Sequence, residues 1–68
     1  MKYDGKFSIG DIYDMIEDYG TYKMALVSGA PVATLYNWVD GKTHRRPTRK
    51  QFVKVLKVLG YTLNDVRY

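Results

Sequence analysis

The sequence contains no cysteine, a single histidine and only two prolines among its 68 residues. Without cysteine, neither a disulfide framework nor a cysteine-based zinc site can stabilise the chain. The one histidine, His44, has no second ligand of its kind, so we expect no metal ion and no cofactor. The stability of so small a chain must therefore come from the packing of its own side chains.

Long apolar runs are also missing. No segment approaches the roughly 18 consecutive apolar residues of a membrane span, and the first residues, MKYDGKFS, contain no apolar stretch of the kind found in signal peptides. We therefore expect no contact with membranes and a cytoplasmic protein. The chain has no internal repeat or low-complexity segment, and its length fits one domain covering residues 1–68.

What the sequence has instead is an uneven charge, with a formal net value of +4. Residues 1–20 hold two basic and five acidic side chains, whereas residues 21–68 hold nine basic and two acidic ones. The segment GKTHRRPTRK, residues 41–50, has five basic side chains and no acidic one. A surface that is basic on one side suggests a polyanionic partner; the plain alternative is a solvated face of a soluble protein.

Residues 8–20 have the pattern of an amphipathic helix. Ser8 can cap its start, with Asp11 as the reciprocal partner three residues later. Gly20 then ends the helix, because glycine suits the position that follows a last helical turn. The apolar residues of this segment share one helical face: Ile9, Ile12, Ile16 and Tyr19.

A second, shorter helix is predicted between Gly20 and Gly29. It begins at Thr21, and its apolar residues are Met24, Ala25 and Val27. Gly29 ends it, because glycine adopts a positive φ without the penalty that a Cβ imposes. The small side chain of Ala25 lets the next helix approach this one closely.

The third helix starts near Pro31, where the missing N–H costs nothing, and it ends at Asp40-Gly41. Leu35 and Trp38 face the core, so that the start of this helix projects outward. Two short helices joined by a tight turn form a helix-turn-helix. A projecting helix end of this kind suits the major groove of DNA.

The last third of the chain predicts one more helix and a final turn. Thr48 and Gln51 have the spacing of a capping box, and Gly60 suits the helix end. Thr62 and Asp65 have the same spacing ahead of a last turn. No segment alternates as a strand would, so we predict an all-α fold of four to five short helices. The apolar stripe of the fourth helix consists of Phe52, Val55, Leu56 and Leu59.

With these residues the chain resembles the lambda-repressor/Cro-like, or XRE-type, helix-turn-helix DNA-binding domains. The resemblance covers about Ile9 to Val66 and implies an all-α fold of about five helices. It also implies operator DNA as the ligand, commonly bound by a homodimer on an inverted repeat, and the role of a small transcriptional regulator of phages or other mobile elements. The matching residues are Ala25, Gly29, Thr34, Leu35, Trp38, Gly41, Lys42 and Pro47, followed by FVKVLKVLGYTLNDV.

The resemblance implies that bases are read from the start of the third helix, at Val32, Ala33, Tyr36 and Asn37. Of these, only Asn37 can make a bidentate contact, to adenine, while Tyr36 offers a hydroxyl to a base or a phosphate. The first turn, APVA, is almost apolar, where many relatives have polar residues. Apolar side chains can contact a thymine methyl, so we expect specificity to rest partly on thymine methyls and on DNA shape.

Phosphates are expected to be held by three groups of residues around this helix. The loop KTHRR is longer than the loop of the family and basic, and it can clamp phosphates or reach a neighbouring minor groove. The expected phosphate contacts are Thr21, Tyr22 and Lys23 in the second helix, Lys42, Thr43, His44, Arg45 and Arg46 in the loop, and Arg49 and Lys50 in the fourth helix.

Sequence-specific binding of duplex DNA is the leading hypothesis for function. A protein-interaction module that uses the tyrosines and the acidic first helix is one alternative, and an RNA-binding use of the same scaffold is another. We expect neither an enzyme nor a small-molecule substrate. The carboxylates of the first helix lack a nucleophile or basic partner nearby and are better explained by solubility: Asp11, Asp14, Glu17 and Asp18.

Overall fold

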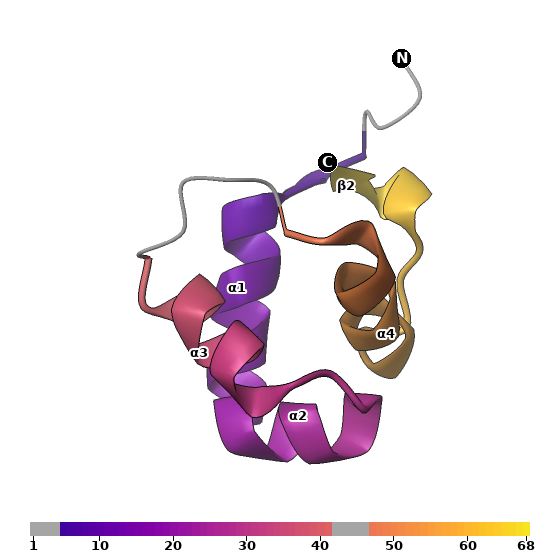
Figure 1. Ribbon diagram of the computed structural model, residues 1–68. Helices are drawn as coiled ribbons and strands as arrows, with labels where there is room; N and C mark the ends of the chain where they lie inside the picture. Colours follow the sequence, from indigo (N-terminus) through magenta and orange to yellow (C-terminus); the bar gives the residue numbers. More distant parts are fainter. Residues whose placement is uncertain (1–4, 42–46) are drawn as a thin grey trace.

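The computed structural model describes residues 5–41 and 47–68. This part of the chain is mostly helical, at 69%, with four α-helices. In Figure 1, α1 and α3 stand on one side, α2 crosses the base and α4 stands on the other side. In chain order the elements are β1 (Phe7–Ser8), α1 (Ile9–Tyr19), α2 (Thr21–Ser28), α3 (Val32–Val39), α4 (Arg49–Leu59), the 3₁₀ helix η1 (Leu63–Asp65) and β2 (Val66–Arg67).

Local signals set both ends of α1, as predicted. The Asp11 amide donates to Ser8 Oγ at 3.0 Å, and the Ser8 amide donates to Asp11 Oδ2 at 2.9 Å. This reciprocal pair satisfies two amides that the first helical turn leaves without partners. At the other end Gly20 has a φ of 110°, and its amide donates to the last carbonyls of the helix.

The ends of α4 follow the sequence signals less closely. Gly60 ends the helix in the left-handed conformation, with a φ of 88°. The predicted capping box of Thr48 and Gln51 is wrong, because among the described residues Thr48 makes no side-chain cap hydrogen bond. Gln51 is instead half-buried, and its Oε1 atom is enclosed without a hydrogen-bond partner in the described part of the chain. Capping-box spacing therefore does not form a cap where the fold encloses the second side chain.

Two strands of two residues each correct the expectation of a purely helical chain. β1 and β2 pair in parallel, with Phe7 opposite Val66 and Ser8 opposite Arg67. The Arg67 Nη1 atom also donates to the carbonyl oxygen of Gly5 at 2.9 Å. Strands this short cannot show an alternating pattern, and their partners lie at opposite ends of the sequence. In place of a fifth α-helix the chain forms η1, which has the predicted capping box of Thr62 and Asp65.

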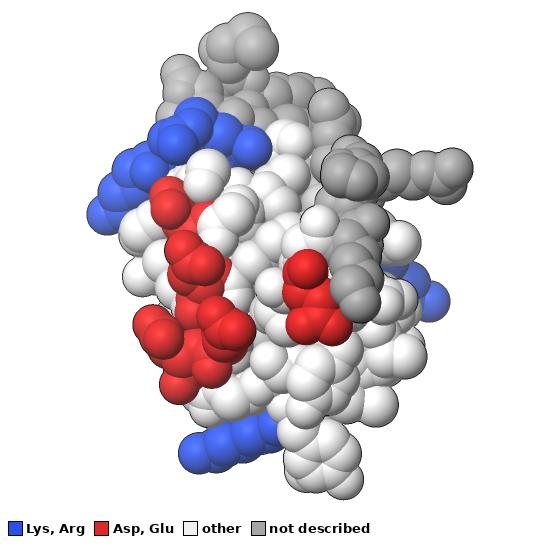
Figure 2. Space-filling model, turned by 90° about the vertical axis from the view of Figure 1, so that its left-hand side faces the viewer, with Lys and Arg blue, Asp and Glu red and all other residues white. Residues whose placement is uncertain are grey.

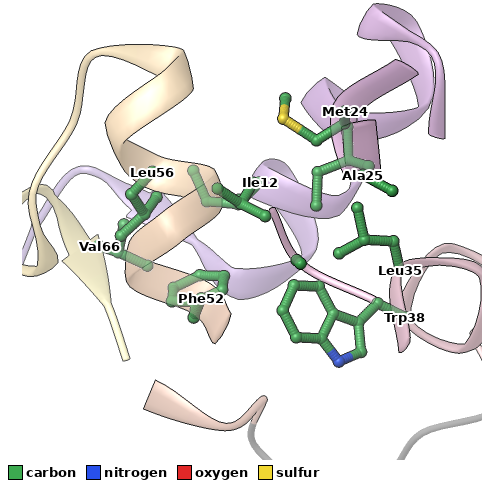
Figure 3. Packing of buried hydrophobic residues seen from close by; sticks show 11 residues of the cluster. Ile12, Met24, Ala25, Leu35, Trp38, Phe52, Leu56 and Val66 are labelled. Carbon is green, nitrogen blue, oxygen red and sulfur yellow. The ribbon is translucent and has the colours of Figure 1, made fainter. Parts of the chain in front are cut away.

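The core lies between α1, α2, α3 and α4 (Figure 3), and aromatic rings join three of these helices. The Trp38 ring stacks on Tyr13 at 5.6 Å between centroids and meets the edge of Phe52 at 5.9 Å. Phe52 in turn contacts Tyr68 at 5.7 Å, and the Tyr68 hydroxyl donates to the carbonyl of Pro47 at 2.6 Å. The buried apolar residues are Ile12, Ile16, Met24, Ala25, Ala30, Leu35, Trp38, Phe52, Val55, Leu56 and Val66.

The close packing of the chain around Gly5 provides a test of the pairing between β1 and β2. A Cβ at this position would overlap the backbone of Asp65 and Val66. We expect Gly5→Ala to lower the free energy of unfolding by about 1–3 kcal/mol, the usual cost of overpacking. Gly10→Ala is the matched control, because its Cβ would meet only Ser8 Oγ at 3.7 Å. Denaturant unfolding of both variants measures the effect, and equal stability of the two would contradict the pairing of β1 with β2.

The hydroxyl of Tyr13 gives a second test, since it is buried without a hydrogen-bond partner in the described part of the chain. Burial, with a smaller contribution from nearby Tyr68, raises the pKa of Tyr13 from 10.0 to about 12. The neutral phenol therefore favours the folded state below pH 10, and this advantage disappears as the pH rises from about 10 to about 12.

We expect Tyr13→Phe to be about 1 kcal/mol more stable than the parent protein at pH 7, because it removes an unpaired polar atom from the interior. The parent should also lose more stability than the variant between pH 10 and pH 12. Urea unfolding of both proteins at several pH values measures the difference. A less stable variant at pH 7 would mean that the hydroxyl has a partner.

Candidate nucleic-acid interface

The turn between α2 and α3 occupies residues 29–31 and depends on Gly29. This glycine has a φ of 82° and a ψ of 5°, and its amide donates to the carbonyl of Ala25 at 3.0 Å. The Ala30 amide donates to Ser28 Oγ at 3.2 Å, and Pro31 is extended immediately before α3. A left-handed residue at the helix end reverses the chain within one turn, so that α3 packs back against α2.

Burial divides α3 into two faces. Leu35 is fully buried and Trp38 is 4% exposed, and these two residues hold the helix against the core. On the outer face, Val32 is 37% exposed and Tyr36 45% exposed, and Ala33 and Asn37 are exposed as well. The structure therefore brings the four predicted base-reading residues together on one solvent-facing surface.

The predicted phosphate contacts of α2 lie at its first turn. Tyr22 and Lys23 are exposed, whereas Thr21 is half-buried. Lys23 Nζ lies 5.2 Å from the centroid of the Tyr19 ring, a cation–π contact that leaves the ammonium group at the surface. Because α2 packs against α3, these residues belong to the same helix pair as the predicted base-reading residues.

The other predicted phosphate contacts are farther away or outside the described residues. Arg49 and Lys50 are exposed in the first turn of α4. In Figure 1 this turn lies in the upper part of the molecule, while the first turn of α3 lies near the base beside α2. The structure therefore does not bring these two cations together with the start of α3. The predicted loop contacts Lys42, Thr43, His44, Arg45 and Arg46 lie outside the described residues.

An exposed apolar surface on α2 was not predicted. All the large hydrophobic residues exposed in the described chain lie on α2 and α3. Leu26 is 67% exposed and Val27 is 55% exposed, although Val27 is one of the three apolar residues expected for α2. Helical geometry contained the signal: with Met24 and Ala25 buried, the next two side chains point away from the core. The members of this set are Tyr22, Leu26, Val27, Val32 and Tyr36.

Acidic side chains form a ridge along α1 (Figure 2), on the side of the molecule where α3 also lies. All of these side chains are exposed, so none of them packs in the core. A polyanion that approaches this side of the molecule would be repelled by the ridge. The ridge consists of Asp11, Asp14, Glu17 and Asp18.

No protein-family model, curated protein or solved structure proved significantly similar to this chain. Within residues 5–41 and 47–68, no helix is both long enough and apolar enough to cross a membrane. The same residues contain no group of three or more His, Cys, Asp or Glu side chains placed to hold a metal ion.

The turn at Gly29 can be tested apart from packing, because a Cβ there would meet no atom within 4 Å. Any cost of a side chain at this position is therefore conformational. We expect Gly29→Val to lower the free energy of unfolding by about 1–2 kcal/mol, since a β-branched residue resists positive φ. Gly29→Asn is the matched control and should cost less, because Asn tolerates the left-handed conformation. Thermal unfolding with equal midpoints for both variants would count against a left-handed turn.

Proposed function

We propose that this chain is a lambda-repressor/Cro-like helix-turn-helix domain that binds duplex DNA with sequence specificity as a small transcriptional regulator. In this proposal α3 enters the major groove and α2 lies across the backbone. The observation that carries it is the division of α3 into two faces. Leu35 and Trp38 fix the helix on the core, and the outer face presents Val32, Ala33, Tyr36 and Asn37 to solvent.

The charge distribution supports a nucleic-acid ligand. No residue within α3 is charged, although the exposed Asp40 caps its C-terminal end and the acidic ridge of α1 lies on the same side of the molecule (Figure 2). The exposed cations Lys23, Arg49 and Lys50 lie in the first turns of the neighbouring helices. A duplex groove has phosphates on both sides, and contacts to them supply most of the sequence-independent affinity. Because Arg49 and Lys50 are separate from the start of α3, a phosphate contact by either of them would lie away from the bases being read.

The two polar residues on the outer face of α3 can make different contacts with DNA. The carboxamide of Asn37 can contact N6 and N7 of adenine together, and Tyr36 carries one hydroxyl that can reach a base or a phosphate. If the protein binds as a homodimer, the two copies of α3 lie about 34 Å apart, and the half-sites of an inverted repeat have centres ~10 base pairs apart. Selection from random duplexes would give the site and its symmetry, and a short asymmetric site would mean binding by one chain.

Asn37 and Lys50 allow base reading to be separated from phosphate binding. On the selected site, Asn37→Ala should cost ~1–3 kcal/mol while binding to random duplexes barely changes. Lys50→Ala should weaken binding to all duplexes alike and reduce the slope of log affinity against log salt by about 1. Asn64→Ala is the control for Asn37→Ala, because Asn64 is an exposed residue of η1, which lies on the other side of the molecule from α3 (Figure 1). Fluorescence anisotropy at several salt concentrations measures all four proteins.

Two results would reject parts of this proposal. If Lys50→Ala changes sequence preference and Asn37→Ala does not, the bases are read outside α3. If selection yields no duplex that binds more tightly than random sequence at low salt, the function itself is wrong. Competition by single-stranded RNA would detect an RNA-binding use of the scaffold.

A second candidate function, protein interaction, is favoured by the exposure of Leu26 and Val27. Two neighbouring apolar side chains exposed on a small domain are a feature of association surfaces. A Leu26→Ser, Val27→Ser variant separates the two functions. If the variant binds DNA as the parent does, Leu26 and Val27 are not needed for DNA binding and remain candidates for contact with a protein partner. If the parent protein binds no DNA, protein interaction replaces DNA binding as the leading candidate.

A further inference from the structure

The start of α3 exposes apolar side chains where a reading helix ordinarily offers hydrogen-bonding groups. Pro31, Val32 and Ala33 are consecutive and exposed, and Val32 is 37% exposed. None of the three side chains contains a donor or an acceptor. If α3 enters the major groove, these positions therefore cannot distinguish base edges by hydrogen bonds, and they can respond only to the shape and apolarity of what they meet.

The major groove offers one apolar group on a base edge, the methyl at C5 of thymine. A cytosine methylated at C5 carries the same group at the same ring position, although its neighbouring exocyclic group is a donor where thymine has an acceptor. Valine and alanine form no hydrogen bond to either exocyclic group. Burying the methyl group against these two side chains lowers the free energy of the complex, whichever pyrimidine carries the methyl.

Resting on the proposed function, we propose that Val32 and Ala33 read C5-methyl groups. The preferred ligand class is then duplex DNA in which the pyrimidines that face the start of α3 are C5-methylated, as thymine or as 5-methylcytosine. Uracil and unmethylated cytosine are disfavoured at the same positions. Binding therefore depends on the methylation state of DNA wherever a cytosine occupies such a position.

On α3 the neighbours of Val32 and Ala33 on the outer face carry polar groups, which favours a base edge there over the apolar partner that Leu26 and Val27 of α2 would suit. Tyr36 and Asn37 are exposed residues of the same outer face of α3, and their side chains carry groups of the kind that pair with base edges. The one charged residue within α2 and α3 is Lys23, whose ammonium complements phosphate.

Four duplexes that differ at one pyrimidine test the inference, once a site has been selected. The thymines of the site are replaced one at a time by deoxyuridine, and the position with the largest loss is then rebuilt with cytosine and with 5-methylcytosine. We expect thymine to bind about fourfold more tightly than uracil, and 5-methylcytosine about fourfold more tightly than cytosine, the effect of burying about one methyl group. Each comparison leaves the hydrogen-bonding groups of the base pair unchanged.

Protein variants then show which side chain reads the methyl. In Val32→Ala or Ala33→Gly the preference for thymine over uracil should fall to less than twofold. Val27→Ala is the matched control: it removes the same atoms from an exposed valine of α2 and should keep the full preference. Because Val32 and Val27 are both exposed, the variants are expected to fold, and circular dichroism checks this.

The outcomes separate the inference from the function on which it rests. Equal binding of the methylated and unmethylated members of both pairs overturns the inference and leaves sequence-specific DNA binding intact. A preference that persists unchanged in both α3 variants overturns the assignment to Val32 and Ala33. Failure to select any duplex rejects the proposed function, and the inference with it.

Discussion

The position of Trp38 is the constraint on which the described fold depends. Its ring is enclosed between Tyr13 of α1 and Phe52 of α4, so one side chain of α3 joins three helices. Neither α2 nor α3 has more than eight residues, and helices of that length are not stable alone in water. The orientation of α3 therefore comes from tertiary contacts, and the exposure of its outer face is a direct consequence of burying Trp38 and Leu35.

The two ends of the chain reinforce this arrangement from the other side of the core. Tyr68 contacts the Phe52 ring and donates to Pro47, the residue from which the described chain continues into α4. The β1–β2 pair holds the C-terminal segment next to the start of α1. In a domain with a small core, such contacts between distant parts of the sequence add stability that the short helices cannot supply.

Those elements that depend on neighbouring residues could be predicted from the sequence. Ser8 with Asp11, Thr62 with Asp65, and the glycines at 29 and 60 act within a few residues, and each lies where the sequence signals indicated. The predictions that failed concern features that depend on contacts between residues far apart in the sequence. The pairing of Phe7 with Val66 leaves no local pattern, and the predicted cap by Gln51 is absent because the fold encloses that side chain. For the candidate site, the outer positions of α3 were implied by the resemblance and agree with the burial of Leu35 and Trp38, whereas the exposure of Leu26 and Val27 was missed although the expected burial of Met24 and Ala25 implied it.

A nearly apolar reading helix changes how affinity and specificity are divided in the proposed complex. Phosphate contacts by exposed cations supply affinity without sequence preference. Specificity then rests on few groups: one carboxamide, one phenol and the methyls of Val32 and Ala33. The acidic ridge of α1 (Figure 2) repels phosphate whatever the base sequence, so it affects how a duplex approaches and not which bases are preferred. In the proposed complex, discrimination therefore comes from contacts at the base edges, with fewer hydrogen bonds to bases than a polar reading helix would make.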